Sequence, residues 1–260
     1  MVTTTASYRI VTNDLKRSLS STATQPQVAR ESKYYLSNIE KIKSIDDFLK
    51  NDRVYRFAMK AHGLEDMIYA KAFMKKVLTE GVDRSDSFAN GLSDPRFKEF
   101  AAVFNFARDG EIATVFEATR QGTVDRYVRQ TLEQQAGEEN EGVRLALYFA
   151  RKAPELRNTL EILADKALIT VVQTALAIPA ATSQQDIDKQ VEMLGKRLNV
   201  ADFKDPRKLD RFIERFTSLW ELNNRSSSGS SSALSIGQPI EAGLGVDILA
   251  SLQNLKLGGR

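Results

Sequence analysis

The sequence predicts an all-α protein, a multi-helix bundle built from two similar helical modules with flexible N- and C-terminal segments. Apolar residues recur every three or four positions through most of the chain, which is the spacing of one helix face. Capping residues precede several of these stripes, and glycines follow them. Alternation of apolar and polar residues, which is typical of a half-buried strand, is limited to a short stretch at Tyr8–Val11.

The composition excludes several classes of function. The 260 residues are 42% hydrophobic and 27% charged, which suffices for a sizeable core. The 37 basic and 34 acidic residues are interleaved and leave a net charge of +3, which argues against nucleic-acid binding. A chain with no cysteine and one histidine lacks disulfides, thiolate ligands and multi-histidine metal sites. We therefore expect no cofactor and no metal.

We expect neither a secretory signal peptide nor a membrane-spanning segment. Its start, MVTTTASYRIVTNDLKRSLSS, contains no apolar core of a secretory signal peptide. The most apolar stretch, 167–181, is interrupted by polar residues and falls short of the roughly 20 residues that a membrane span needs. We expect a cytoplasmic protein with no membrane span.

The N-terminal part is expected to comprise an arm and a first module. Residues 1–27 are polar and rich in Thr and Ser, so we expect a flexible arm there, with a short strand at Tyr8–Val11. The first helical module is expected at 28–106. Within it, Ser44 can cap a helix by accepting a hydrogen bond from the amide three residues on. Gly63 then suits the end of that helix, because glycine adopts positive φ.

A second module is expected after a connecting region. Residues 107–153 carry shorter apolar stripes and are predicted to be connecting helices. The second module is expected at 154–222, opening with an apolar helix that runs from Pro154 to Ile178. The composition changes abruptly after Leu222.

Two stretches of the chain resemble each other. The apolar positions of Phe48–Leu64 coincide with those of Ile162–Ile178, and Asp94-Pro95-Arg96 reappears later as Asp205-Pro206-Arg207. The two DPR segments each begin a helix with an aromatic face. Helical proteins also reuse caps and apolar stripes independently. The agreement in order and spacing favours an internal duplication.

No residue pattern indicates catalysis. His62 is placed in the last turn of a helix, where its positive form suits the helix dipole, and Glu65 and Asp66 are its possible partners. The aromatic stripes at 97–106 and 212–220 are expected to pack in the core. A solvated face is the favoured interpretation of the basic positions in the middle of the chain, namely Arg126, Arg129, Arg144, Arg151, Lys152 and Arg157.

The C-terminal segment is the candidate site for a partner. Residues 223–260 begin with a Ser/Gly-rich linker and end in a short amphipathic pattern. A stripe this small cannot bury itself, so the segment either folds back onto the domain or docks into a groove on another protein. In the docking case the expected anchors are Ile248, Leu249, Leu252 and Leu255.

The chain resembles a bacterial family of unknown biochemical function. The resemblance covers about residues 40–222 and rests on FLKNDRVYRFAMKAHGLED, KKVLTEG, LSDPRFKEFAAVFNF and DPRKLDRFIERFTSLWE. Members of this family are found among the flagellar genes of alphaproteobacteria related to rhizobia. The resemblance implies a helical protein connected with flagellar assembly or motility, without assigned catalytic residues. In that setting the alternatives to a cytoplasmic location are association with the flagellum and export by the flagellar route.

Three hypotheses follow for the function. The first is a non-enzymatic protein-interaction component linked to the bacterial flagellum or motility, with a protein partner for which a flagellar component is one candidate. The second is a helical protein that binds a small ligand in a pocket between the two modules. The third is an enzyme of unfamiliar type, which needs a cleft where His62 or a carboxylate meets other polar groups. The oligomeric state stays open.

Overall fold

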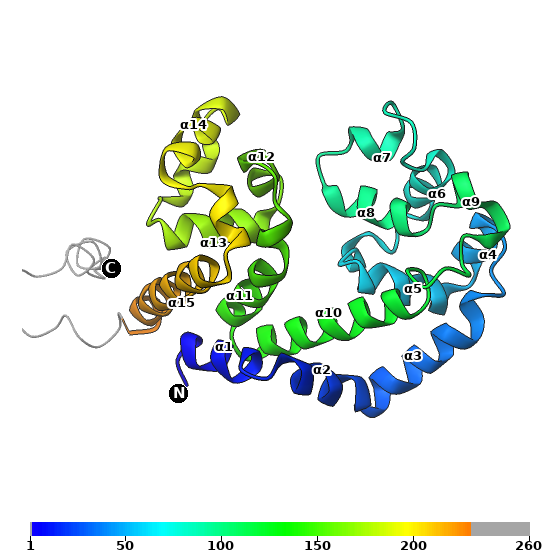
Figure 1. Cartoon of the computed structure of the whole chain (residues 1–260), viewed down its shortest axis with the longest axis horizontal. Coiled ribbons are helices and arrows are strands. Elements are labelled where there is room, and N and C mark those ends of the chain that lie inside the picture. The colour runs from blue at the N-terminus through cyan, green and yellow to red at the C-terminus, as the bar shows by residue number, and fades with distance from the viewer. Residues whose placement is uncertain (1, 230–260) are drawn as a thin grey trace, which may run out of the picture. The chain divides into compact units, whose positions relative to one another are not determined.

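The structure, a computed structural model, describes residues 2–229, with side chains to Asn224. Every regular element in this part of the chain is a helix, which confirms the predicted all-α class (Figure 1). The residues up to Leu222 form one compact unit. The C-terminal residues of the expected docking segment lie outside the described part of the chain.

The first part of this unit contains ten α-helices and two short 3-10 helices. Their bounds are α1 Thr4–Thr12, α2 Leu15–Thr24, α3 Pro26–Ile39, α4 Ile45–Lys50, α5 Asp52–Ala61, η1 Glu65–Met67, α6 Lys71–Glu80, α7 Phe88–Gly91, α8 Pro95–Val103, α9 Phe106–Asp109, η2 Gly110–Ile112 and α10 Gln121–Glu139. The remaining elements are α11 Glu141–Lys152, η3 Ala153–Glu155, α12 Thr159–Leu163, α13 Lys166–Ala175, η4 Ala180–Gln184, α14 Ile187–Arg197, η5 Val200–Lys204 and α15 Pro206–Gly229.

The apolar stripes pack into two separate hydrophobic cores. The first core is built from α3 to α10, with Phe48, Phe100 and Phe104 fully buried at its centre. The second core is built from α11 to α15, around Phe149 and Phe216. The region predicted only to connect the modules contributes to both cores, because α10 packs in the first and α11 in the second.

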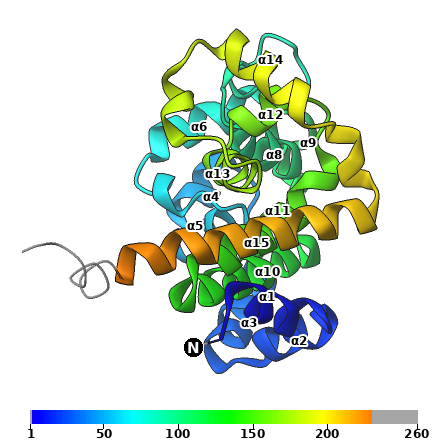
Figure 2. The ribbon, with the colours of Figure 1, turned by 90° about the vertical axis from the view of Figure 1, so that its left-hand side faces the viewer.

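The expectation of a flexible N-terminal arm with a strand is wrong. Residues 4–24 form α1 and α2, whose first turns are capped by Thr3 and Asp14. The side chain of Tyr8 is buried in the second core. The amide and hydroxyl of Thr4 both donate to the carboxylate of Glu221, at 2.9 and 2.5 Å. These contacts with α15, beside which α1 lies in Figures 1 and 2, outweigh the low helix propensity of the Thr- and Ser-rich sequence.

The single helix predicted from Pro154 to Ile178 is also wrong. The structure has η3, α12 and α13 in its place. Asn158 accepts from the amide of Glu161 and begins α12, and Asp165 accepts from the amides of Ala167 and Leu168 and begins α13. Each of these side chains satisfies amides that have no partner inside a helix, so each favours a new helix over continuation of the old one.

The local geometry of the two similar stretches repeats. Residues at helix boundaries recur at one constant separation in sequence, namely Ser44 and Asn158, Asn51 and Asp165, His62 and Leu176, and Gly63 and Ala177. The closing turn repeats as well: the amide of Leu64 donates to the carbonyl of Met59, and that of Ile178 to the carbonyl of Gln173, both at 2.8 Å. The resemblance seen in the sequence therefore extends to capping and backbone conformation.

One position in this repeat is strained. Gly63 has φ of +69°, and its counterpart Ala177 has φ of +51°. A residue with a side chain costs about 1–2 kcal/mol in the left-handed region. We expect Ala177→Gly to raise the free energy of unfolding by about 0.5–1 kcal/mol, after the greater flexibility of glycine in the unfolded chain is subtracted.

The matched variant is Gly63→Ala. A methyl group at Gly63 would meet its nearest atom at 3.8 Å, so there is room for it, and φ alone sets the cost. We expect this substitution to lower the free energy of unfolding by about 1–2 kcal/mol. Urea denaturation of both variants measures the difference. If Ala177→Gly and Gly63→Ala changed the free energy of unfolding in the same direction, backbone conformation would not control stability at this turn.

Candidate functional site

A cleft of about 790 Å³ opens among helices that belong to both cores. Its walls are the turn after α5, the beginning of α8, one face of α10, one face of α11, the beginning of α13 and Trp220 of α15. Most of its lining side chains are charged. The cleft is therefore a polar feature within a unit whose apolar faces are largely buried, and it is the candidate functional site.

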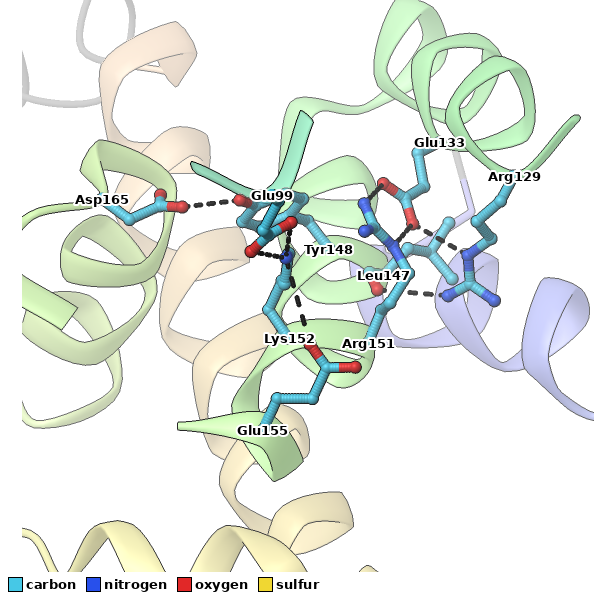
Figure 3. A network of polar contacts seen from close by, with 9 residues as sticks. All are labelled: Glu99, Arg129, Glu133, Leu147, Tyr148, Arg151, Lys152, Glu155 and Asp165. Atoms are coloured by element: carbon cyan, nitrogen blue, oxygen red, sulfur yellow. Dashed lines mark hydrogen bonds and ion pairs between the residues drawn. The ribbon is translucent and has the colours of Figure 1, made fainter. Parts of the chain in front are cut away.

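An ion triad centred on a buried carboxylate lies at the wall of the cleft, to which Arg151 belongs. The side chain of Glu133 on α10 is only 2% exposed. It accepts from the Arg129 guanidinium one helical turn earlier, at 2.8 Å, and from the Arg151 guanidinium of α11 through two bonds of 2.9 Å (Figure 3). Arg129 also donates to the backbone carbonyl of Leu147 at 3.2 Å. The triad therefore fixes α11 against α10.

A second ion pair joins the two sides of the cleft. The Nζ atom of Lys152 on α11 lies 2.6 and 2.7 Å from the two carboxylate oxygens of Glu99 on α8. The carboxylate of Glu155 lies 3.9 Å from the same Nζ (Figure 3). Lys152 is 16% exposed and Glu99 is 49% exposed. The pair is therefore partly screened by solvent, and it connects a helix of the first core to a helix of the second.

Tyr148 and Asp165 form the third polar contact. The Tyr148 hydroxyl donates to the Asp165 carboxylate at 2.5 Å (Figure 3). The same carboxylate caps α13 through the amides of Ala167 and Leu168. Burial raises the pKa of Tyr148, and the negative charge of Asp165 raises it further. Tyr148 therefore stays protonated and acts as a fixed hydrogen-bond donor.

His62 lies at the edge of the cleft in an unusual environment. It follows the last residue of α5, as predicted, and its ring packs edge-on against Phe100 at 5.2 Å between centroids. Its Nε2 atom is buried and has no hydrogen-bond partner within the described residues. Burial lowers the pKa of His62 to about 3, with further lowering by the charges of Arg126, Lys152 and Arg151. The imidazole is therefore neutral at physiological pH, and the expectation that its positive form interacts with the helix dipole is wrong.

The suggested partners of His62 make other contacts. Glu65 pairs with Lys60 at 3.6 Å, and Asp66 lies 3.6 Å from Arg96. Neither carboxylate lies within ion-pair distance of the imidazole in the described part of the chain. A histidine with so low a pKa is a poor proton donor or acceptor near neutral pH. This geometry offers little support for acid–base catalysis by His62.

The state of His62 gives a pH prediction. Below its ordinary pKa of 6.5 the imidazole takes up a proton in the unfolded chain but not in the folded one, so acid favours unfolding. Between pH 7 and 4.5, we expect the free energy of unfolding to fall by about 2 kcal/mol more in wild type than in His62→Leu. Above pH 7 we expect the two proteins to have the same pH dependence. Leucine is the matched replacement because Leu176 occupies the corresponding position. If the free energies of unfolding of wild type and His62→Leu changed in parallel with pH, the imidazole would not be buried in its neutral form.

The other residues singled out in the sequence have clear places in the structure. Phe97, Phe100 and Phe216 are core residues, as expected. The interpretation of the basic positions as a solvated face is wrong for Arg129 and Lys152, whose side chains are 14% and 16% exposed. Ile248, Leu249, Leu252 and Leu255 lie outside the described residues. Sequence reasoning did not find Asp165 or Glu99, because only folding brings them to the cleft.

The described residues contain neither a candidate metal site nor a membrane-spanning helix. Among residues 2–229, no three His, Asp or Glu side chains converge in a way that could hold a metal ion. Over the same residues, no helix combines the length and the hydropathy required to cross a bilayer.

Comparison with known proteins identifies the family of this chain. The model of a family described as "Protein of unknown function (DUF1217)" matches residues 61–209, a span that includes most of the cleft. The chain is 49% identical to protein AGR_C_984 from Agrobacterium tumefaciens, whose crystal structure matches over 85% of this chain and 94% of that one with a TM-score of 0.79. No curated protein matches. Because the family match spans more than half of the chain, this protein belongs to the DUF1217 family.

Proposed function

We propose that this protein is a non-enzymatic protein-interaction component linked to the bacterial flagellum or motility, and that a protein partner binds in the charged cleft. The flagellar setting rests on the family resemblance of residues 40–222. The cleft is the single observation that carries the binding proposal, because it is a large concave surface lined by charged side chains from several helices.

The distribution of apolar residues supports a polar rather than an apolar binding surface. The aromatic stripes at 97–106 and 212–220 pack in the two cores, as do most other apolar stripes of the described residues. The cleft instead presents charges of both signs, and such surfaces give an interface its specificity and its rate of association. The neutral state of His62 supports a role in binding over a role in proton transfer.

Site-specific crosslinking tests this proposal. Ala164 lines the cleft and is exposed, so a photo-crosslinking amino acid can replace it without disturbing the core. Ser37 on α3 is exposed outside the cleft and is the matched control. In the source bacterium we expect a flagellar protein to be crosslinked from position 164 and not from 37, and we expect deletion of the gene to reduce swimming. Normal swimming of the deletion strain, or identical crosslinks from both positions, would contradict the proposal.

The C-terminal segment is a second contact in the same proposal. Ile248, Leu249, Leu252 and Leu255 are expected to anchor it on the partner, with the Ser/Gly-rich linker setting its reach. Removal of residues 225–260 is expected to leave thermal unfolding unchanged and to weaken binding of the crosslinked partner. Unchanged affinity would reject docking by this segment and would leave the cleft as the proposed site.

A small-ligand-binding protein is the second candidate, favoured by the size of the cleft. A volume of about 790 Å³ lies within the range of small-molecule sites, roughly 300–1,000 Å³. Native mass spectrometry of protein purified from the source bacterium distinguishes the two. A stoichiometric bound small molecule, displaced when the cleft is altered, would favour this candidate over a protein partner.

A further inference from the structure

We propose that the cleft holds an anion-binding subsite on the wall formed by Arg126, Gln130 and the His62 turn, with Lys166 facing the same cleft from α13. This inference rests on the proposed binding function of the cleft and specifies its chemistry. The subsite takes a carboxylate or phosphate group, and an acidic side chain of a protein partner and a free phosphate share that chemistry.

The geometry of this wall comes from two elements. Arg126 and Gln130 are four residues apart on α10, so they lie on the same face of that helix, and both line the cleft. Gln130 reaches the turn after α5, where a methyl group on Gly63 would lie 3.8 Å from its Nε2 atom. The carbonyl of Gly63 is already occupied by the guanidinium of Arg96. The wall therefore presents the hydrogen-bond donors of Arg126 and Gln130. The nearby backbone acceptor, the carbonyl of Gly63, already accepts from Arg96.

The carboxylates of the cleft mostly have partners. Asp94 is held by Arg96 at 2.7 Å, Glu141 accepts from Nε of Arg144 at 2.8 Å, and Asp165 accepts from Tyr148 and from helix amides. Glu99 is bound by Lys152. Glu155 lies 3.9 Å from Lys152 and is 72% exposed, so solvent screens it.

Two cations of the cleft lack such a partner. Within the part of the chain that the structure describes, neither Arg126 nor Lys166 has a carboxylate within ion-pair distance. Arg126 donates only to the carbonyl of Gly122 one turn earlier, at 3.2 Å. Both side chains belong to exposed residues. In addition, Arg129 and Arg151 share the single carboxylate of Glu133, which leaves one excess positive charge in a triad whose Arg151 lines the cleft. The charged side chains of this cleft that have neither an ion pair nor a hydrogen bond to another side chain among the described residues are therefore cations, and they favour an anionic ligand.

The electrostatic environment of His62 agrees with this assignment. After burial, the influences that lower the pKa of His62 are the positive charges of Arg126, Lys152 and Arg151. The charges that shift the pKa of His62 are therefore those of cations, although carboxylates also line the cleft. An anion bound beside Arg126 is expected to raise the pKa of His62, because it stabilises the imidazolium.

The chain contains two natural reporters of the subsite. It has one tryptophan, Trp220, and one histidine, His62, and both line the cleft. Trp220 fluorescence and the imidazole signals of His62 in the NMR spectrum therefore report on the cleft without labelling. We expect titration of the full chain with inorganic phosphate or with hexaglutamate to change both signals saturably, and hexaglutamine to change neither.

Charge-matched variants make the test specific. Arg126→Glu and Arg30→Glu alter the net charge equally, but Arg30 lies on α3 outside the cleft and its side chain is 70% exposed. We expect Arg126→Glu to weaken anion binding roughly ten- to a hundred-fold, and Arg30→Glu to leave it nearly unchanged at about 0.15 M salt. Arg126→Gln, which only removes the charge, is expected to weaken it less. Thermal unfolding checks that each variant is folded.

The outcomes separate this inference from the function on which it rests. Binding of hexaglutamate that depends on Arg126 supports an acidic protein segment as the source of the anion, and binding of phosphate alone supports a free anion. Flat titrations with both probes, or equal losses in Arg126→Glu and Arg30→Glu, overturn the subsite. If crosslinking from Ala164 persists in that case, the cleft still binds a partner and only its anionic chemistry is rejected.

Discussion

Replacing Glu133 by glutamine is expected to lower the free energy of unfolding by about 3–5 kcal/mol. The substitution keeps the shape of the side chain and removes the only carboxylate that the structure places between Arg129 and Arg151. Burial opposes the charge on Arg151, and the hydrogen bonds and negative charge of Glu133 offset that effect, so the pKa of Arg151 is raised. Without Glu133, the guanidinium groups of Arg129 and Arg151 lose the carboxylate that they share. Urea denaturation measures the loss.

A control and a double-mutant cycle show whether burial is the cause. Glu99→Gln also removes a carboxylate from an ion pair, but Glu99 is 49% exposed, and we expect a cost of at most about 1 kcal/mol. Combining Glu133→Gln with Arg151→Gln is expected to cost less than the sum of the single changes, because each alone leaves a partner unpaired. A loss below 1 kcal/mol for Glu133→Gln would mean that water reaches the triad and replaces the carboxylate.

The features of the fold that depend on neighbours in sequence could be predicted from the sequence. Ser44 accepts from the amide of Asp47, Gly63 ends its helix with positive φ, and Asp94 with Pro95 begins α8. Each of these involves residues within a few positions of each other, so the residue types suffice. The sequence also contains a local signal for the break at Asn158, because Asn158 and Glu161 form a capping pattern. The prediction of one uninterrupted helix gave more weight to the apolar character of the stretch than to this pattern.

The features that depend on distant residues could not be predicted in this way. The order of α1 depends on Glu221, which lies more than 200 positions from Thr4 in the chain. A sequence rich in Thr and Ser therefore indicated a flexible arm, although tertiary hydrogen bonds stabilise it as a helix. The cleft is a similar case, since the pair of Lys152 and Glu99 joins residues of different helices that no local pattern connects.

Charge is where sequence reasoning failed most clearly. Arg129 and Glu133 are four residues apart, and this spacing is typical of a solvent-exposed pair on a helix. Arg151 approaches from the next helix and, together with Arg129, covers the Glu133 carboxylate, whose side chain is 2% exposed. The same residue types at the same spacing can therefore form a surface pair that contributes a few tenths of a kcal/mol. They can also form part of a buried triad whose disruption costs several kcal/mol, and the sequence pattern does not distinguish the two.

Gly142→Ala is expected to lower the free energy of unfolding by about 3 kcal/mol, near the upper end of the range for overpacking. A methyl group on Gly142 would lie 2.3 Å from Cδ1 of Trp220 and 2.8 Å from a methyl carbon of Thr4. Three helices therefore meet at this glycine: α1, α11 and α15. Relief of the clash requires that the side chains of Trp220 and Thr4 move, by rotation or with their helices, and movement of Thr4 would disturb its hydrogen bonds. Thermal denaturation and the fluorescence of Trp220 measure both consequences.

Gly195→Ala is the matched control, because it makes the same chemical change in a helix where the new methyl group touches nothing. No atom lies within 4 Å of a methyl group at Gly195 in α14, so only intrinsic helix propensity acts there, and we expect stabilisation of about 1 kcal/mol. Opposite signs for the two variants would show that close approach, and not helix propensity, requires glycine at 142. Stabilisation by both would mean that Trp220 is not packed against α11. In that case Trp220 would be free to leave the cleft that it lines.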